Sequence, residues 1–315
     1  MTTLGGAERA IMEAPTFLEA AMDVPSDLGE FLKSRRAALR PEAVGLTPLP
    51  TRRRVRGLRR EELAMLSGVS VTHYTRLEQG RAAGASDSVL TAIARTLRLT
   101  DDETAHLRAL ARPSRRTTPS RPEHASASVR QLLSAMPGVP ALALDRRNDI
   151  LAWNTPGHTL LAPHLPTDAP DSAAIRPNLT RMLFLDPTYR ALYRDWPTEA
   201  VLAVASLRQV TANHPHDQRL TDLVGQLTIH SDEFTTLWKR HPVRTCTSGV
   251  KRLHHPTAGP LDLTFETLTL PSPSGQRMIT YTAEAGSSSE RALRVLQSLD
   301  RPYAVPGSGS RVGLS

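Results

Sequence analysis

Two sets of residues in the first third of the chain could bind a nucleic acid. Six arginines lie within nine positions: Arg52, Arg53, Arg54, Arg56, Arg59 and Arg60. A guanidinium group can donate two parallel hydrogen bonds to one phosphate group. We therefore expect these arginines to clamp DNA phosphates or to form an arm that enters a DNA groove. A second set follows at Val71, Thr72, His73 and Arg76. These side chains offer a methyl surface, a hydroxyl, an imidazole and a guanidinium, which can contact base edges of double-stranded DNA.

The charge of the chain is concentrated around these residues. Residues 33–81 hold 12 Lys and Arg against 4 Asp and Glu, which equals the formal net charge of +8 for all 315 residues. The remainder is therefore neutral, and the natural partner of the basic segment is a polyanion. A solvated basic surface and binding without sequence preference remain alternatives.

An apolar pattern predicts the elements that position these side chains. In "RGLRREELAMLSGVSVTHYTRLEQGR" apolar residues recur at helical spacing on both sides of Gly68. We predict two helices, the first ending at Gly68 and the second capped by Ser70. Tyr74 and Leu77 fall on the inner face of the second helix. Its N-terminal residues can then lie in the major groove.

The rest of the chain divides by composition. Further helices are expected in "SDLGEFLKSRRAAL", capped by Ser26, in "SDSVLTAIARTLRL", capped by Ser86, and in "TDDETAHLRALA". The stretch "RPSRRTTPSRPEHASAS" is poor in apolar residues and is typical of a linker. The predicted parts are an N-terminal extension (1–26), an all-α helix-turn-helix domain (27–111), a linker (112–128), a second domain (129–298) and a disordered tail (299–315).

The segment "EELAMLSGVSVTHYTRLEQGR" resembles the helix-turn-helix domain of the Cro/C1 and xenobiotic-response-element family. The resemblance implies sequence-specific DNA binding over about residues 27–111. It also implies that Arg36, late in the first helix, pairs with Glu78 of the "LExG" motif and does not read DNA. One such domain has only a small contact area with DNA. Two copies that bind two half-sites of one DNA site double this area, so we expect a homodimer.

The second domain has a different periodicity. "ALALDRRNDILAWN" is two short apolar runs around turn residues, which predicts a β-hairpin. Helical stretches follow, interrupted at Pro187 and Pro197, and then "LDLTFETLTL" and "RMITYTAE" alternate as strands do. We therefore expect an α+β domain with a PAS-like sheet backed by helices.

Aromatic residues gather in this domain, although they make up only 4% of the chain. The candidates for an apolar ligand pocket are Trp153, Phe184, Trp196, Phe234 and Trp238. An ordinary hydrophobic core also explains the clustering, and composition alone favours the core.

Four blocks of the second domain resemble successive parts of the MmyB-like ligand-binding domain. They are "PALALDRRNDILAWN", "NLTRMLFLDPTYRALYRDW", "LVGQLTIHSDEFTTLWKRHPV" and "GVKRLHHPTAGPLDLTFETLTL", over roughly residues 130–285. The resemblance implies a PAS-like fold with an apolar cavity and a fatty-acid-like small-molecule effector. For an acidic effector, Arg181, Arg190 and Arg194 are candidate partners. The alternative is a domain that only dimerises or binds a protein partner.

Enzymatic signatures are weak. His214, His216, His254 and His255 lack the paired helical spacing of a zinc site, and Cys246 is the only cysteine. We find no Gly-x-Ser-x-Gly, no P-loop and no dinucleotide-binding motif. We therefore expect no enzyme, no metal and no cofactor, with an enzyme that regulates its own gene as a further alternative.

The compartment follows from two features. A single cysteine excludes an internal disulfide, which suits a reducing environment. No apolar run approaches the roughly 18 to 20 residues that span a bilayer, and Glu13 and Glu19 interrupt the apolar stretch near the N-terminus. We expect a cytoplasmic protein without membrane contact.

Overall fold

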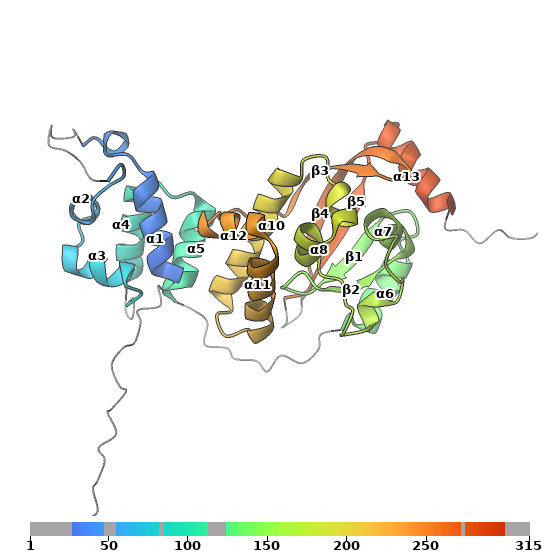
Figure 1. Ribbon diagram of the computed structural model, residues 1–315, viewed down its shortest axis with the longest axis horizontal. Coiled ribbons are helices and arrows are strands. Elements are labelled where there is room, and N and C mark those ends of the chain that lie inside the picture. Colours follow the sequence, from blue (N-terminus) through green and yellow to red (C-terminus); the bar gives the residue numbers. More distant parts are fainter. Residues whose placement is uncertain (1–26, 47–54, 82–84, 113–123, 272–274, 300–315) are drawn as a thin grey trace, which may run out of the picture.

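Two bodies make up the computed structural model, a small helical unit and a larger unit built on a sheet (Figure 1). The described residues are 27–46, 55–81, 85–112, 124–271 and 275–299. The predicted cap Ser26, the N-terminal extension, most of the linker and residues 300–315 of the predicted tail lie outside them. Leu299, the first residue of the predicted tail, is the last residue of a helix.

The N-terminal unit is all helical. Its elements are α1 (Asp27–Ala38), the 3-10 turn η1 (Pro41–Val44), α2 (Arg60–Ser67), α3 (Val71–Glu78), α4 (Asp87–Thr96) and α5 (Asp101–Ala111). Fully buried side chains from α1, α2, α3 and α4 form its core, among them Phe31, Leu63, Tyr74 and Ile93. The helices are short, so tertiary packing of these apolar faces must supply most of their stability.

The turn between α2 and α3 follows the sequence prediction. Gly68 has φ 67°, and its N–H donates to carbonyls at the end of α2. Such a left-handed residue favours glycine, which has no Cβ to clash. The Ser70 hydroxyl accepts a hydrogen bond from the backbone N–H of His73 at 3.2 Å. Ser86 caps α4 in the same way, so these predicted caps are confirmed.

The second unit contains a five-stranded antiparallel sheet in the order β2-β1-β5-β4-β3. The strands are β1 (Ala141–Leu144), β2 (Ile150–Trp153), β3 (Ser248–His255), β4 (Gly259–Thr269) and β5 (Arg277–Thr282). The predicted hairpin is confirmed, with Leu142 opposite Trp153 and Asn148 at φ 72° in its turn. Along β4, Leu261, Leu263 and Phe265 are buried and their neighbours are exposed, which explains the alternating sequence.

Helices cover the sheet. They are α6 (Ala127–Ser134), α7 (Thr155–Leu161), the 3-10 turn η2 (Ala169–Asp171), α8 (Leu179–Leu185), α9 (Pro187–Ala191), α10 (Trp196–Asn213), α11 (Gln218–His230), α12 (Asp232–Lys239) and α13 (Ser288–Leu299). Leu142 and Leu144 of β1 join the large core with α8, α10 and α11, whereas Ala141 and Ala143 face α6. The expected all-α domain followed by an α+β domain is confirmed.

The two units are in direct contact. Helix α10 packs against α5, and α10 and α12 face the N-terminal unit (Figure 1). Val243, which follows α12, packs against the core of the N-terminal unit. Asp102 at the start of α5 accepts a hydrogen bond from the backbone N–H of Thr245 at 2.8 Å. In the described part of the chain, no helix is long and apolar enough to cross a membrane.

Candidate DNA-binding surface and ligand pocket

Helix α3 presents the predicted reading residues on its outer face. Val71 is 42% exposed, and Thr72 and Arg76 are exposed as well. Tyr74 and Leu77 are buried in the core, as the helical spacing predicts. The outer edge of α3 can therefore enter a groove while its inner edge holds the helix in the domain.

The predicted phosphate-binding arginines occupy different settings. Arg56 and Arg59 are exposed before and at the start of α2, where backbone N–H groups also favour an anion. The Nε of Arg60 bonds to Glu78 Oε2 at 2.5 Å, although 47% of its side chain remains exposed. Arg52, Arg53 and Arg54 lie outside the described residues. His73, the remaining predicted base-contacting residue, is half-buried.

Glu78 joins the first three helices. Its carboxylate accepts hydrogen bonds from Arg36 Nε of α1 at 2.6 Å, from Arg60 of α2, and from the Tyr74 hydroxyl at 2.9 Å. Only 2% of the Glu78 side chain is exposed. Burial alone would raise the pKa of this carboxyl, but the hydrogen bonds from Arg36, Arg60 and Tyr74 outweigh burial, so the pKa is lowered. The pair that the family resemblance implies is present.

The loop before α2 is fixed to α1. A Cβ at Gly57 would lie 2.4 Å from the carbonyl oxygen of Ala37, so only glycine allows the loop to approach this closely. Arg36 Nη1 donates to the carbonyl of Leu58 at 2.7 Å, and the Leu58 N–H donates back to Arg36. The same arginine thus holds both α3 and the loop that carries Arg56.

Four of the five predicted aromatic residues form one continuous cluster. The ring of Phe184 lies 5.7 Å from Trp196 and 5.2 Å from Phe234, and Phe234 stacks on Trp238 at 5.4 Å. Trp153 is not part of it, since its ring lies 4.9 Å from His158 and its N–H donates to the carbonyl of Thr167. Phe184 and Phe234 are buried, so the cluster packs as part of the domain core.

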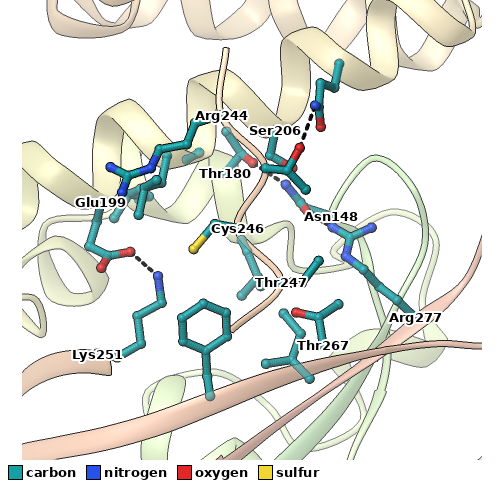
Figure 2. Close-up of a pocket in the computed structure, with 18 of the residues that line it drawn as sticks. Asn148, Thr180, Glu199, Ser206, Arg244, Cys246, Thr247, Lys251, Thr267 and Arg277 are labelled. Carbon is teal, nitrogen blue, oxygen red and sulfur yellow. Dashed lines mark hydrogen bonds and ion pairs between the residues drawn. The ribbon is translucent and has the colours of Figure 1, made fainter. Parts of the chain in front are cut away.

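A cavity of about 340 Å³ lies beside this cluster, between α8, α10, the segment before β3, and strands β4 and β5 (Figure 2). None of the five predicted aromatic residues lines it. Its apolar wall includes Leu183, Val210, Phe265 and Ile279. Trp196 stands behind this wall, because its indole N–H donates to the carbonyl of Leu183 at 2.9 Å.

The cavity also holds charged groups. Lys251 pairs with Glu199 and lies 4.5 Å from the centre of the Phe265 ring, and Arg244 also lines the cavity. On the other side Arg277 contacts Asn148, and burial lowers the pKa of its guanidinium. These three cations can meet an anionic headgroup.

Three tyrosines form a further wall of the cavity. The hydroxyls of Tyr189 and Tyr193 are 2.7 Å apart, and Tyr281 also lines the space. Burial raises the pKa of each hydroxyl, so all three are neutral and can share hydrogen bonds with a polar ligand group.

The arginines proposed from sequence as carboxylate partners lie elsewhere. Arg190 stacks on Trp196 at 3.7 Å and pairs with Glu233. Arg194 pairs with Asp262 at 3.1 Å, and Arg181 donates to the carbonyl of Arg176 at 2.6 Å. None of the three lines the cavity.

The described residues contain no group of three or more His, Cys, Asp or Glu side chains placed to hold a metal ion. Cys246 is exposed at the cavity, and His255 bonds to the carbonyl of Thr159 at 3.0 Å.

Comparison with known families agrees with this division into two domains. Residues 27–107 match a helix-turn-helix domain. Residues 125–296, more than half of the chain, match the MmyB-like transcription regulator ligand binding domain. A search of curated proteins found no match. The chain belongs to the family of transcription regulators that carry an MmyB-like ligand-binding domain, joined here to an N-terminal helix-turn-helix domain.

Proposed function

We propose that this protein is a cytoplasmic, homodimeric regulator that binds specific DNA sites and responds to an apolar, fatty-acid-like molecule, without catalytic activity of its own. One observation carries the proposal. A basic domain with an open recognition helix is joined to a domain with a cavity of about 340 Å³. This cavity is apolar on one wall and is also lined by Arg244, Arg277 and the Lys251–Glu199 ion pair.

The exposed side chains of α3 support sequence reading. Val71, Thr72 and Arg76 face outward near the start of the helix, and Arg59 lies at the N-terminus of α2. In this arrangement α3 contacts bases, while Arg56, Arg59 and the neighbouring arginines hold phosphates.

The cavity supports an amphipathic acid as the effector. Its volume falls within the roughly 300 to 1,000 Å³ typical of small-molecule sites. Leu183, Phe265 and Ile279 would contact the alkyl chain, and Lys251 or Arg277 would meet the carboxylate. The aromatic cluster stabilises the wall behind the ligand.

Native mass spectrometry of the purified protein and calorimetric titration with dodecanoic acid test this proposal. We expect a retained acyl compound or saturable binding, weakened by Ile279→Asp in a variant that circular dichroism shows to be folded. Dodecanol is the matched control, because it keeps the alkyl chain and lacks the charge. A stable dimer without acyl compound, and no heat with any acid from 8 to 16 carbons, would exclude the fatty-acid effector.

The alternative is a second domain that only dimerises or binds a protein partner. Val250 and Leu268 favour it, because they are 57% and 52% exposed on the outer face of the sheet. Apolar side chains on an open sheet face are typical of an interface. The same native mass spectra distinguish the two functions.

A further inference from the structure

Residues 241–247, between α12 and β3, connect the cavity with the DNA-binding domain, and we call them the bridging segment. At one end, Arg35 Nη2 of α1 donates to the carbonyl of His241 at 2.5 Å. Val243 packs against the core of the DNA-binding domain. The N–H of Thr245 donates to Asp102 at the start of α5. The segment is therefore seated on both α1 and α5.

The other end of the bridging segment is part of the cavity wall. Arg244, Thr245, Cys246 and Thr247 all line the cavity, and Figure 2 shows the segment crossing it. The Thr245 hydroxyl accepts a hydrogen bond from Gln209 of α10 at 2.9 Å. Thr245 thus hydrogen-bonds to Asp102 of the DNA-binding domain through its backbone N–H, and to Gln209, which lines the cavity, through its hydroxyl.

The segment can move more easily than the elements around it. It has no regular secondary structure, and residues 244–247 are exposed. Backbone with little burial opens at low free-energy cost. A ligand that displaces Thr245 or Arg244 therefore acts on an exposed, irregular part of the cavity wall and on the hydrogen bond to Asp102.

The contacts continue to the recognition helix. Arg35 and Arg36 are neighbours on α1, and Arg35 also pairs with Glu103 of α5 at 3.1 Å. Arg36 holds Glu78 at the end of α3. The bridging segment thus contacts the same helix that positions α3, and it leaves the outer face of α3 open.

We propose that the bridging segment couples occupancy of the cavity to the seating of the DNA-binding domain, through Thr245–Asp102 and His241–Arg35. The inference rests on the proposed function of the cavity as a ligand site. A ligand in the cavity changes how the DNA-binding domain is held against the ligand domain only if it binds one position of the bridging segment more tightly than another. Thr245 connects the two events, because it lines the cavity and donates its N–H to Asp102.

Labelling of Cys246, the only cysteine of the chain, tests the coupling without knowledge of the effector. Full-length protein is treated with hexyl methanethiosulfonate, which places an alkyl chain at the cavity wall. Methyl methanethiosulfonate is the matched control, since it modifies the same sulfur and fills little space. Hydrogen exchange is then measured for α1, α5 and the bridging segment.

We expect the hexyl label to speed exchange in the bridging segment and the first turn of α5 by about tenfold relative to the methyl label, as opening of a weakly held segment allows. In Asp102→Ala the α5 response should disappear. In Asp101→Ala, where the neighbouring acid is removed, it should persist. Equal exchange in α1 and α5 with both labels, at complete labelling by mass, would overturn the coupling.

The coupling and the proposed effector can fail separately. If dodecanoic acid does not bind but the hexyl label changes exchange in α5, the fatty-acid effector is wrong and the coupling stands. If dodecanoic acid binds, and neither it nor the label changes exchange in α1 or α5, the coupling is wrong and the cavity remains a ligand site.

Discussion

At the scale of single residues, Glu78 connects three helices of the DNA-binding domain. It holds Arg36 from α1 and Arg60 from α2, and it accepts the Tyr74 hydroxyl from its own helix. A buried charge is stable only when oppositely charged or hydrogen-bonding partners offset its loss of hydration. Removal of one partner therefore leaves a buried charge without that compensation and destabilises the fold. The orientation of helix α3 therefore depends on this carboxylate as well as on the buried Tyr74 and Leu77.

Glu78→Ala should destabilise the DNA-binding domain by about 3 to 5 kcal/mol, because it leaves Arg36 as an unpaired, largely buried cation. Denaturant unfolding followed by circular dichroism measures the loss. Glu61→Ala, an exposed glutamate of α2, is the control and should change stability by less than about 0.5 kcal/mol. An unchanged midpoint for Glu78→Ala would reopen Arg36 as a DNA contact.

Two buried histidines at the junction of the units predict a pH dependence. Burial, together with the positive charges of Arg208 and Arg35, lowers the pKa of His106 and His241 to about 4. The carboxylate of Glu30 also faces His241, with its Oε2 at 3.4 Å from His241 Nε2. His106 also packs edge-on against Phe31. Because the pKa of each histidine is lowered to about 4, both imidazole rings are neutral in the docked molecule at pH 7.

The docked state should lose stability as pH falls from about 6.5, the usual histidine pKa, towards 4. In this window the undocked or unfolded chain takes up protons that the docked histidines do not, so stability falls by up to about 1.4 kcal/mol per pH unit for each histidine. Melting curves at several pH values should show a smaller slope for His106→Phe. His216→Phe, at an exposed site, should keep the wild-type slope.

At the scale of elements, the sequence predicted what local chemistry determines. Gly68 and Ser70 fix the turn before α3 through contacts within five residues, and both were predictable. Helix α6 is short and follows a Ser-rich stretch, so its own sequence carries little signal, and packing on β1 decides it. Helix α13 was missed too, although Leu293 and Leu296 have helical spacing.

The family resemblance implied a cavity, but its position and its lining were beyond prediction for a related reason. Its walls come from α8, α10, the bridging segment, β4 and β5, which are far apart in the chain. Aromatic clustering in a sequence reports burial, and here Phe184, Phe234 and Trp238 pack on one another. Tyr189, Tyr193 and Tyr281 line the cavity instead, and only the fold brings Tyr281 to the other two.

Substitutions on helix α3 should weaken binding to a specific DNA site more than binding to random DNA. Thr72→Ala and Arg76→Ala should each cost about 1 to 3 kcal/mol on a selected site and little on random DNA, because a lost base contact affects one sequence. Arg59→Ala should weaken both and reduce the salt dependence, since a phosphate contact carries no sequence information. Fluorescence anisotropy at several salt concentrations measures both effects. Equal losses on both DNAs would contradict the placement of α3 in the major groove.

At the scale of the whole molecule, the ligand domain does not cover the recognition helix. Helices α2 and α3 lie on the side of the DNA-binding domain away from α10 and α12 (Figure 1). This arrangement therefore does not favour a mechanism in which the ligand domain covers α3 and blocks DNA binding. The contacts with the ligand domain lie on α1 and α5. In the dimer proposed above, a ligand would therefore change how the two DNA-binding domains are spaced and oriented.

Coupling between the two sites must be reciprocal. If dodecanoic acid changes affinity for a selected DNA site by about 5- to 150-fold, a coupling of about 1 to 3 kcal/mol, DNA must change affinity for dodecanoic acid by the same factor. Anisotropy titrations with saturating acid measure the change in affinity for DNA, and calorimetric titrations with saturating DNA measure the change in affinity for the acid.

Asp102→Ala should reduce both factors towards one, because it removes the acceptor of the Thr245 N–H. Asp101→Ala, its neighbour on α5, should leave both unchanged. Unequal factors in the wild-type chain would mean that the two titrations report binding of the acid at different sites. Loss of coupling in both variants alike would assign the effect to the charge of α5 instead of the bridging segment.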